Sequence, residues 1–279
     1  MTPVVFDEIG EWSQIKLEII EKFATAYSRI FGAEKQHRFQ HEYVDAFAGP
    51  GLHISKATGQ IVAGSPLRAL DVNPPFKSYH FIDLDGDKVA MLERLVRERG
   101  APARLYRGDC NDILLTQIFP TLRYDDYKRA LCLLDPYGLH LRWEVMRTAG
   151  QLRTIDMILN FPVADIHRNV LWRHPERVDP ADIARMTAWW GDDSWRRVAY
   201  RKEPTLFGDE EEVKADTRSV VDAFRDRLRS VASFVQVPEP LAMRNSQNAI
   251  VYYLFFASQN ETAARIINDI FSRYRSGSR

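Results

Sequence analysis

The sequence predicts an α/β fold: a doubly wound, mostly parallel, seven-stranded Rossmann-like sheet with a helical insertion after the fifth strand. Short apolar runs alternate along the chain with amphipathic stretches, as successive strand and helix units require. Several of these runs end in an acidic residue followed by turn-forming residues, which is where open α/β sheets bind ligands. The alternation of strand and helix patterns stops in residues 164–210, which carry four of the six tryptophans.

The first helix and strand lead into the most informative stretch. Apolar residues at helical spacing predict a helix over 13–31, and the first strand follows at 42–47. Gly49 and Gly51 come next, and residues without a side chain let a ligand approach the backbone. Residues 51–64 are polar and contain glycine, so we expect a functional loop there before the next helix.

The remaining elements follow in order. Strands are expected at 78–82, 103–107, 130–134 and 157–161, with an antiparallel closing pair near 234–243 and 249–257. Helices are expected at 65–70, 87–99, 111–119, 143–152, 216–231 and 261–275. The chain divides into an N-terminal helical segment (1–41), a cofactor-binding half (42–163), a Trp/Arg-rich helical insertion (164–210) and a C-terminal part that completes the sheet (211–279). The tryptophans of the insertion could offer stacking platforms to a nucleic acid, although tryptophans in helices are more often core residues.

The charge and cysteine content exclude several classes of protein. Lys plus Arg equals Asp plus Glu, 38 against 38, so no field of the whole chain attracts nucleic acid, and any polyanion site must be a local patch. Two cysteines without metal-ligand spacing indicate a reducing compartment and no metal site. The N-terminus lacks a signal-peptide pattern and no apolar run reaches membrane-spanning length, so we expect a cytoplasmic protein without membrane contact.

The strand ends predict a pocket for a small adenosyl ligand, and S-adenosylmethionine is the first choice. Asp45 and Phe47 stand at the end of the first strand, directly before Gly49 and Gly51. The turn lacks both the Lys-Ser/Thr of a P-loop and a complete G-x-G-x-x-G pattern, so it suits a ligand without pyrophosphate. Glycines in a loop, taken alone, are usually only turn formers.

Two later strand ends would complete this pocket. Asp83 ends the second strand, where a carboxylate can accept hydrogen bonds from ribose hydroxyls. Asp85 is expected to cap the next helix. Asp109 ends the third strand and either accepts from an adenine amino group or caps the following helix, two interpretations that the sequence supports equally. Cys110 is expected to be a small apolar filler beside the adenine rather than a nucleophile.

The fourth and fifth strand ends carry the candidate chemistry. Asp135, Pro136 and Tyr137 resemble the D/N-P-P-Y/F/W motif of amino-methyltransferases with one proline instead of two. The acidic oxygen would accept a hydrogen bond from the target amino group, and the aromatic ring would stack on a flipped base. The alternative is a turn that ends the strand. Asn160 stands at the end of the fifth strand and faces the same rim of the expected pocket, and Arg168 follows it closely in the sequence. These two residues either shape the substrate entrance or cap the core.

Taken in order, these motifs resemble those of the three-Cys-motif partner proteins over nearly the whole chain. The shared pattern comprises Trp12 and Lys16-Leu17, Asp45-Ala46-Phe47-Ala48-Gly49-Pro50-Gly51, Gly64-Ser65-Pro66, Phe81-Ile82-Asp83, Gly108-Asp109, Asp135-Pro136-Tyr137-Gly138, Asn160-Phe161-Pro162 and Phe256-Ala257-Ser258-Gln259-Asn260. The resemblance implies a Rossmann-fold methyltransferase that uses S-adenosylmethionine, with Lys16 among the substrate-binding residues. It also implies a partner: a cysteine-motif protein that resembles radical enzymes and whose gene lies next to that of this family in bacteria.

Three functions follow from these expectations. The first is methyl transfer to an amino group of a nucleobase in DNA or RNA. The second is a non-catalytic, methyltransferase-like scaffold that works with the three-Cys protein. The third, a nicotinamide oxidoreductase, is disfavoured because the glycine fingerprint is incomplete.

Overall fold

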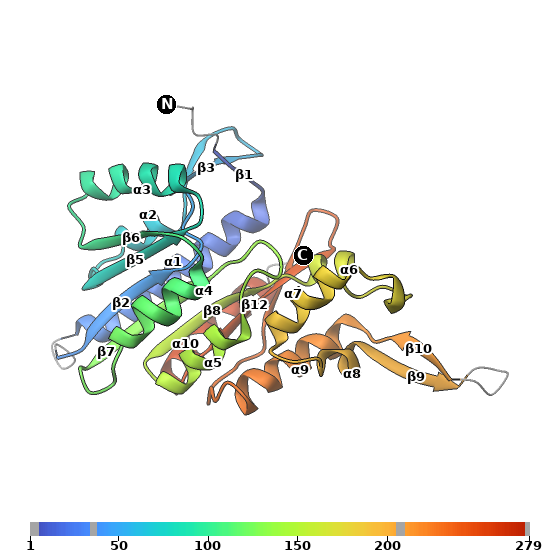
Figure 1. The fold of residues 1–279 in the computed structure, drawn as a ribbon. Coiled ribbons are helices and arrows are strands. Elements are labelled where there is room, and N and C mark those ends of the chain that lie inside the picture. Colours follow the sequence, from blue (N-terminus) through green and yellow to red (C-terminus); the bar gives the residue numbers. More distant parts are fainter. Residues whose placement is uncertain (1–5, 34–37, 205–209, 277–279) are drawn as a thin grey trace.

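A computed structural model describes residues 6–33, 38–204 and 210–276. Its central sheet has seven strands, and helices pack against that sheet (Figure 1). The strand order is β11-β12-β8-β7-β2-β5-β6. Five neighbouring strands are parallel: β2 (Gln40–Asp45), β5 (Ser78–Asp83), β6 (Ala103–Arg107), β7 (Lys128–Leu134) and β8 (Ile155–Phe161). The last two, β11 (Leu241–Arg244) and β12 (Ile250–Ala257), form the expected antiparallel closing pair. The predicted fold class is therefore confirmed.

Helices cover both faces of this sheet. One core cluster joins it to α1 (Glu11–Gly32), α2 (Ser65–Leu70), α3 (Gly86–Glu98) and α10 (Glu261–Ser276). The other cluster joins it to α4 (Cys110–Ile113), α5 (Trp143–Leu152) and α9 (Thr217–Ser230). Successive strand residues enter opposite clusters, Tyr43 the first and Val44 the second, because side chains alternate across a strand. The continuous apolar runs of β7 and β8 follow from burial on both faces.

The segment after the first glycine turn differs from its prediction. Residues 51–64 form a hairpin, β3 (Leu52–Ser55) and β4 (Ile61–Ala63), rather than a loop. The parallel partner of β3 is β1 (Glu8–Ile9), which lies about forty residues upstream and gives no local signal. Two other elements are shorter than expected: the helix over 111–119 is α4 followed by a π-helical turn at Leu114–Ile118, and the strand over 234–243 begins only at Leu241.

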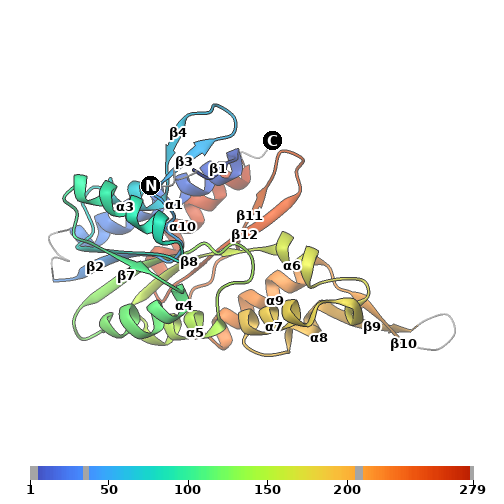
Figure 2. The ribbon, with the colours of Figure 1, turned by 45° about the horizontal axis from the view of Figure 1, so that its top comes forward.

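The insertion contains α6 (Val163–Asn169), α7 (Pro180–Trp190), α8 (Trp195–Ala199) and the two-stranded ribbon β9 (Tyr200–Pro204) and β10 (Glu210–Lys214), which extends away from the sheet (Figure 2). Trp189, Trp190 and Trp195 are buried. The rings of Trp189 and Trp190 lie 6.2 and 5.7 Å from that of Phe224 on α9. These three tryptophans therefore hold the insertion on the core, and Trp172, 42% exposed, alone of the four faces solvent.

Candidate functional site

The predicted acidic residues gather at the edge of the sheet that is formed by the carboxyl ends of its parallel strands. β2, β5 and β7 are parallel, so Asp45, Asp83 and Asp135 stand at strand ends that share this edge. The charges of Asp135 and Asp83 both act to raise the pKa of Asp45, so Asp45 lies within electrostatic range of each of the other two carboxylates.

Asp135 is held by two of the residues predicted for substrate binding. Its Oδ2 lies 2.5 Å from Nζ of Lys16, and its Oδ1 accepts a 2.9 Å hydrogen bond from Nδ2 of Asn160. The Lys16 ammonium also lies 5.2 Å from the ring centroid of Tyr252 on β12. Lys16 belongs to the apolar, buried side of α1, so its long side chain reaches the sheet edge through the core. The structure thus brings Lys16, Asp135 and Asn160 together.

Asp45 is fully buried and lacks complete hydrogen bonding. Its Oδ1 accepts from the backbone N–H of Phe47 at 3.2 Å, whereas no donor among the described residues meets hydrogen-bond geometry at Oδ2. Burial raises the pKa of Asp45 to about 7, although the hydroxyl of Ser65 and the N–H of Phe47 favour the ionised form. Oδ1 of Asn160 is also buried without a partner. Such unpaired buried oxygens are costly.

Asp83 orders the glycine turn. Its Oδ2 accepts from the N–H of Gly49 at 2.8 Å, and its Oδ1 accepts from the N–H of Asp85 at 2.8 Å. Gly49 has a φ of +63°, and a Cβ placed on it would have no atom within 4 Å, so its backbone borders open space. Gly51 is different, because its Cβ would lie 2.8 Å from Leu92. The first glycine therefore fits a close ligand approach and the second fits close packing.

At the end of the third strand, Asp109 caps the following helix, which is one of its two predicted roles. Its Oδ1 accepts from the N–H groups of Asn111 and Asp112 at 2.8 and 3.3 Å, as an N-cap does. Asp85 caps α3 in the same way, as expected. Cys110 is 7% exposed, and burial raises the pKa of its thiol to about 12, so it is an uncharged packing residue at neutral pH. Contact of Asp109 and Cys110 with an adenine stays a prediction.

The turn after β7 presents an aromatic ring to solvent. Pro136 is buried, whereas Tyr137 is 80% exposed. Gly138 has a φ of +71°, and its Cβ would lie 2.6 Å from Oδ2 of Asp165 on α6. The chain must therefore turn at a glycine here, and the turn leaves Tyr137 at the rim.

Arg168 lies on α6, the helix that begins just beyond the end of β8. It is exposed, and its guanidinium makes no ion pair within the described part of the chain. Its carbonyl accepts a 2.6 Å hydrogen bond from Nε1 of Trp172. Arg168 is free to meet an anion, although no contact joins it to Asp135.

The hairpin adds residues that sequence reasoning missed. His53, on β3, has a buried Nδ1 without a partner. Burial lowers the pKa of His53, and the charges of Asp7, Lys16 and Asp135 act on it, so the ring lies near the Lys16–Asp135 pair. Nε2 of Gln14 donates to Oγ of Ser55 at 2.8 Å, which ties the hairpin to α1. The alternation of Leu52, His53, Ile54 and Ser55 was the only available signal.

Two cavities stand out within the described residues, and neither lies at this edge. One, about 460 Å³, follows β11; the other, about 270 Å³, lies at the amino ends of β2, β5 and β7. The expected nucleotide-sized pocket is not one of these two. The described residues also contain no group of three or more His, Cys, Asp or Glu side chains that could hold a metal ion, and no helix there is long and apolar enough to cross a membrane.

No protein-family model and no curated protein matches the chain, so membership of the three-Cys-motif partner family stays a prediction. Among solved structures, a Legionella pneumophila protein of the DUF519 family aligns with a TM-score of 0.59 at 10% identity, over 95% of this chain and 92% of that one. An S-adenosylmethionine-dependent methyltransferase from Clostridium acetobutylicum aligns with a TM-score of 0.44 at 10% identity, over 87% of this chain and 91% of that one. At these identities the likeness concerns the fold alone.

Proposed function

We propose that the chain is an S-adenosylmethionine-dependent methyltransferase that acts on an amino group of a nucleobase in DNA or RNA. The observation that carries this proposal is the position of the Lys16 ammonium at Asp135. A nitrogen donor already occupies Oδ2 of this carboxylate. A target amino group that enters the edge would take over that hydrogen bond, while Asn160 keeps the carboxylate oriented through Oδ1.

The cofactor would lie across Asp45, Gly49, Gly51 and Asp83, with Phe47, Asp109 and Cys110 at its margin. Support comes from the unpaired Oδ2 of Asp45 and the open space beside Gly49. When bound, S-adenosylmethionine supplies an electrophilic methyl group. The residues of the chain then have to position the acceptor, exclude water and take up the proton that the amine loses.

A nucleobase is the favoured acceptor because the rim carries features that suit one. Tyr137 is an exposed ring directly after the acceptor carboxylate, and base stacking on such a ring contributes about 1–3 kcal/mol per base. Pro136 is buried and fixes the chain between Asp135 and Tyr137. The free guanidinium of Arg168 suits a phosphate oxygen of the same substrate.

Calorimetry and methyl transfer test this proposal together. The purified protein should bind S-adenosylmethionine and S-adenosylhomocysteine, and it should transfer a labelled methyl group to DNA or RNA from its native host rather than to protein. Asp135→Ala should reduce transfer about 10²-fold or more and change cofactor affinity little, because it removes the oxygen that accepts the hydrogen bond from the target amino group. Asp226→Ala, an exposed change on α9, is the matched control. Full transfer by Asp135→Ala would remove Asp135 from the mechanism.

A second candidate is the non-catalytic scaffold that partners a three-Cys protein. Neither of the two cavities described above lies at the strand-end carboxylates, which favours this candidate. Cofactor binding without transfer to any of the host DNA, RNA and protein pools would support this candidate over the first.

A further inference from the structure

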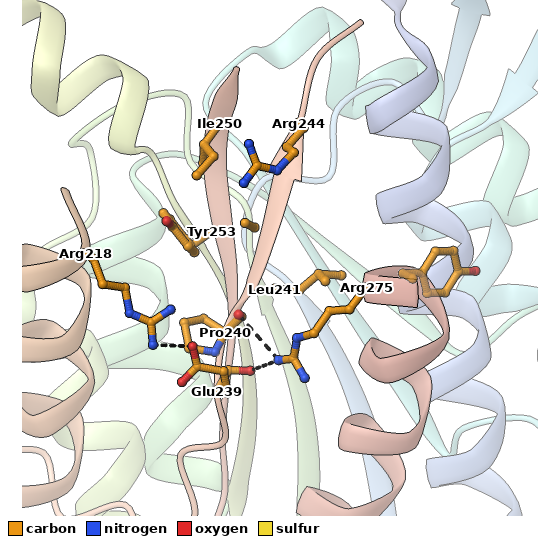
Figure 3. A pocket seen from close by; sticks show the side chains of 10 residues that line it. Arg218, Glu239, Pro240, Leu241, Arg244, Ile250, Tyr253 and Arg275 are labelled. Atoms are coloured by element: carbon orange, nitrogen blue, oxygen red, sulfur yellow. Dashed lines mark hydrogen bonds and ion pairs between the residues drawn. The ribbon is translucent and has the colours of Figure 1, made fainter. Parts of the chain in front are cut away.

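A cavity lies along the free edge of the central sheet (Figure 3). β11 pairs only with β12, so the backbone groups on its outer side have no strand neighbour among the described residues. The cavity measures about 460 Å³, and its lining includes Leu241 and Tyr253, both buried. An exposed strand edge beside a hollow lined by apolar and charged side chains is the geometry that accepts an added strand.

Cations surround this edge from three sides. Arg218 reaches it from α9 and Arg275 from α10, which lie on opposite faces of the sheet, and Arg244 ends the edge strand itself (Figure 3). The lining contains one carboxylate, Glu239. Glu239 is already paired with Arg218 and lies 2.9 Å from Arg225. The edge therefore carries an excess of positive charge.

Two of these guanidiniums have no carboxylate partner within the described residues. Arg244 donates to the carbonyl of Asn248 at 2.8 Å, and Arg275 donates to the carbonyl of Glu239 at 2.5 Å. Both side chains belong to exposed residues and keep N–H donors for an incoming anion. Charge-assisted hydrogen bonds from arginine to carboxylate are about twice as strong as neutral ones.

We propose that β11 is a docking site for an extended acidic segment of a partner protein. The segment adds to the sheet as an eighth strand, and its carboxylates meet Arg244 and Arg275. The contact is short, because Pro240 precedes the strand and the register with β12 shifts between Met243 and Arg244. Backbone pairing over so few residues is weak, so the arginines select the partner. A peptide fits better than a nucleic acid because only a peptide satisfies the strand edge.

Fluorescence anisotropy with a fluorescein-labelled Thr-Glu-Val-Glu-Val-Glu-Thr peptide tests the proposal. Binding should be saturable, weaken as salt rises, and be absent for the peptide with lysines in place of the glutamates. The double variant Arg244→Glu/Arg275→Glu should weaken it at least about tenfold, because it reverses both unpaired charges. Arg265→Glu, on the same helix as Arg275 and outside the cavity, should bind the peptide like the natural protein.

Amide hydrogen exchange decides whether the peptide binds as a strand. Saturating peptide should slow exchange within Leu241–Arg244 of the full chain, and the double variant should not show this slowing while its circular dichroism stays unchanged. No saturable binding, equal loss in Arg265→Glu, binding without protection of Leu241–Arg244, or displacement of the peptide by a short oligonucleotide would each overturn the proposal. None of these outcomes depends on cofactor binding or methyl transfer.

Discussion

The ammonium of Lys16 lies 2.5 Å from the carboxylate of Asp135, although 119 residues separate them in the sequence. The pair joins the N-terminal helix to the end of β7, at the edge where the strand-end carboxylates gather. Their side chains are 11% and 25% exposed, so the ion pair is largely shielded from water. A pair in this position either stabilises the fold or reserves Asp135 for a substrate donor.

A double-mutant cycle measures the first of these roles, the stabilisation of the fold. Lys16→Met should lower the free energy of unfolding by about 1–3 kcal/mol, because it leaves a partly buried carboxylate without its cation. Asp135→Asn should lower the free energy of unfolding by a similar amount. The double variant should lower it by less than the sum of the two single changes. Urea unfolding measures all three. An additive cycle would show that the pair contributes no coupling energy, while Lys22→Met, whose exposed ion pair with Glu18 spans 3.8 Å, provides the control.

The buried carboxyl of Asp45 should make cofactor binding depend on pH. Its pKa in the folded chain is about 7, raised mainly by burial, so the group is protonated below this pH and ionised above it. A cationic ligand at this edge needs the ionised form. Affinity for S-adenosylmethionine should therefore rise by up to about tenfold between pH 6 and pH 8. Calorimetry at several pH values measures this, and Asp45→Asn should bind weakly with no such dependence.

The same group should affect stability in the opposite direction. A carboxyl whose folded pKa lies above its unfolded value binds more protons when folded between about pH 4 and pH 7, so its contribution to stability falls as pH rises through that window. Asp45→Asn should remove this loss. The difference in unfolding free energy between variant and natural protein should therefore shift in favour of the variant from pH 4 to pH 8, and a constant difference would contradict the buried, protonated state of Asp45.

The sequence predicted the strand ends well because they depend on local patterns. Asp45, Asp83 and Asp135 each follow an apolar run, and parallel strands bring their carboxyl ends to one edge. The hairpin was missed because its strands are only 4 and 3 residues long, and the further strand that pairs with β3, β1, is distant in the sequence. His53 was missed because the charged groups that act on it, Asp7, Lys16, Asp135 and Lys88, come from segments that are distant in the sequence.

The two possible roles of Asp109 show a second limit of predicting site residues from the sequence. A carboxylate at the start of a helix has the same sequence pattern whether it caps the helix or also binds a ligand. The structure shows that Oδ1 makes both capping bonds. For the insertion the sequence left two interpretations open, stacking platforms or core residues, and the structure shows Trp189, Trp190 and Trp195 buried in the core.

Tyr137 should matter for substrate and not for folding. Because it is 80% exposed, Tyr137→Ala should leave the unfolding midpoint nearly unchanged. If a base stacks on this ring, the variant should bind single-stranded oligonucleotides about tenfold more weakly or worse, while Tyr137→Phe should keep most of the affinity. Anisotropy measures both variants. Equal affinity of Tyr137→Ala and the natural protein would exclude the ring as a stacking platform.

Gly150 should tolerate no side chain, although it lies inside α5, where alanine is normally about 1 kcal/mol better than glycine. A Cβ at this position would overlap the carbonyl oxygen of Ala232, which belongs to the backbone and cannot rotate away. Nε2 of Gln259 bridges the carbonyls of Gly150 and Ser233 at 2.9 and 2.8 Å, which resists separation of the two segments. Gly150→Ala should therefore lower the unfolding free energy by about 3 kcal/mol or more.

Gly59→Ala gives the matched comparison for this last change. A Cβ at Gly59 meets no atom within 4 Å, and only its φ of +69° opposes alanine. Its cost should be about 1 kcal/mol, from the backbone conformation alone. Urea unfolding of the two variants thus separates steric overlap from backbone strain. If Gly150→Ala stabilised the protein, Gly150 of α5 and Ala232 after α9 would have to lie further apart in solution than they do in this structure.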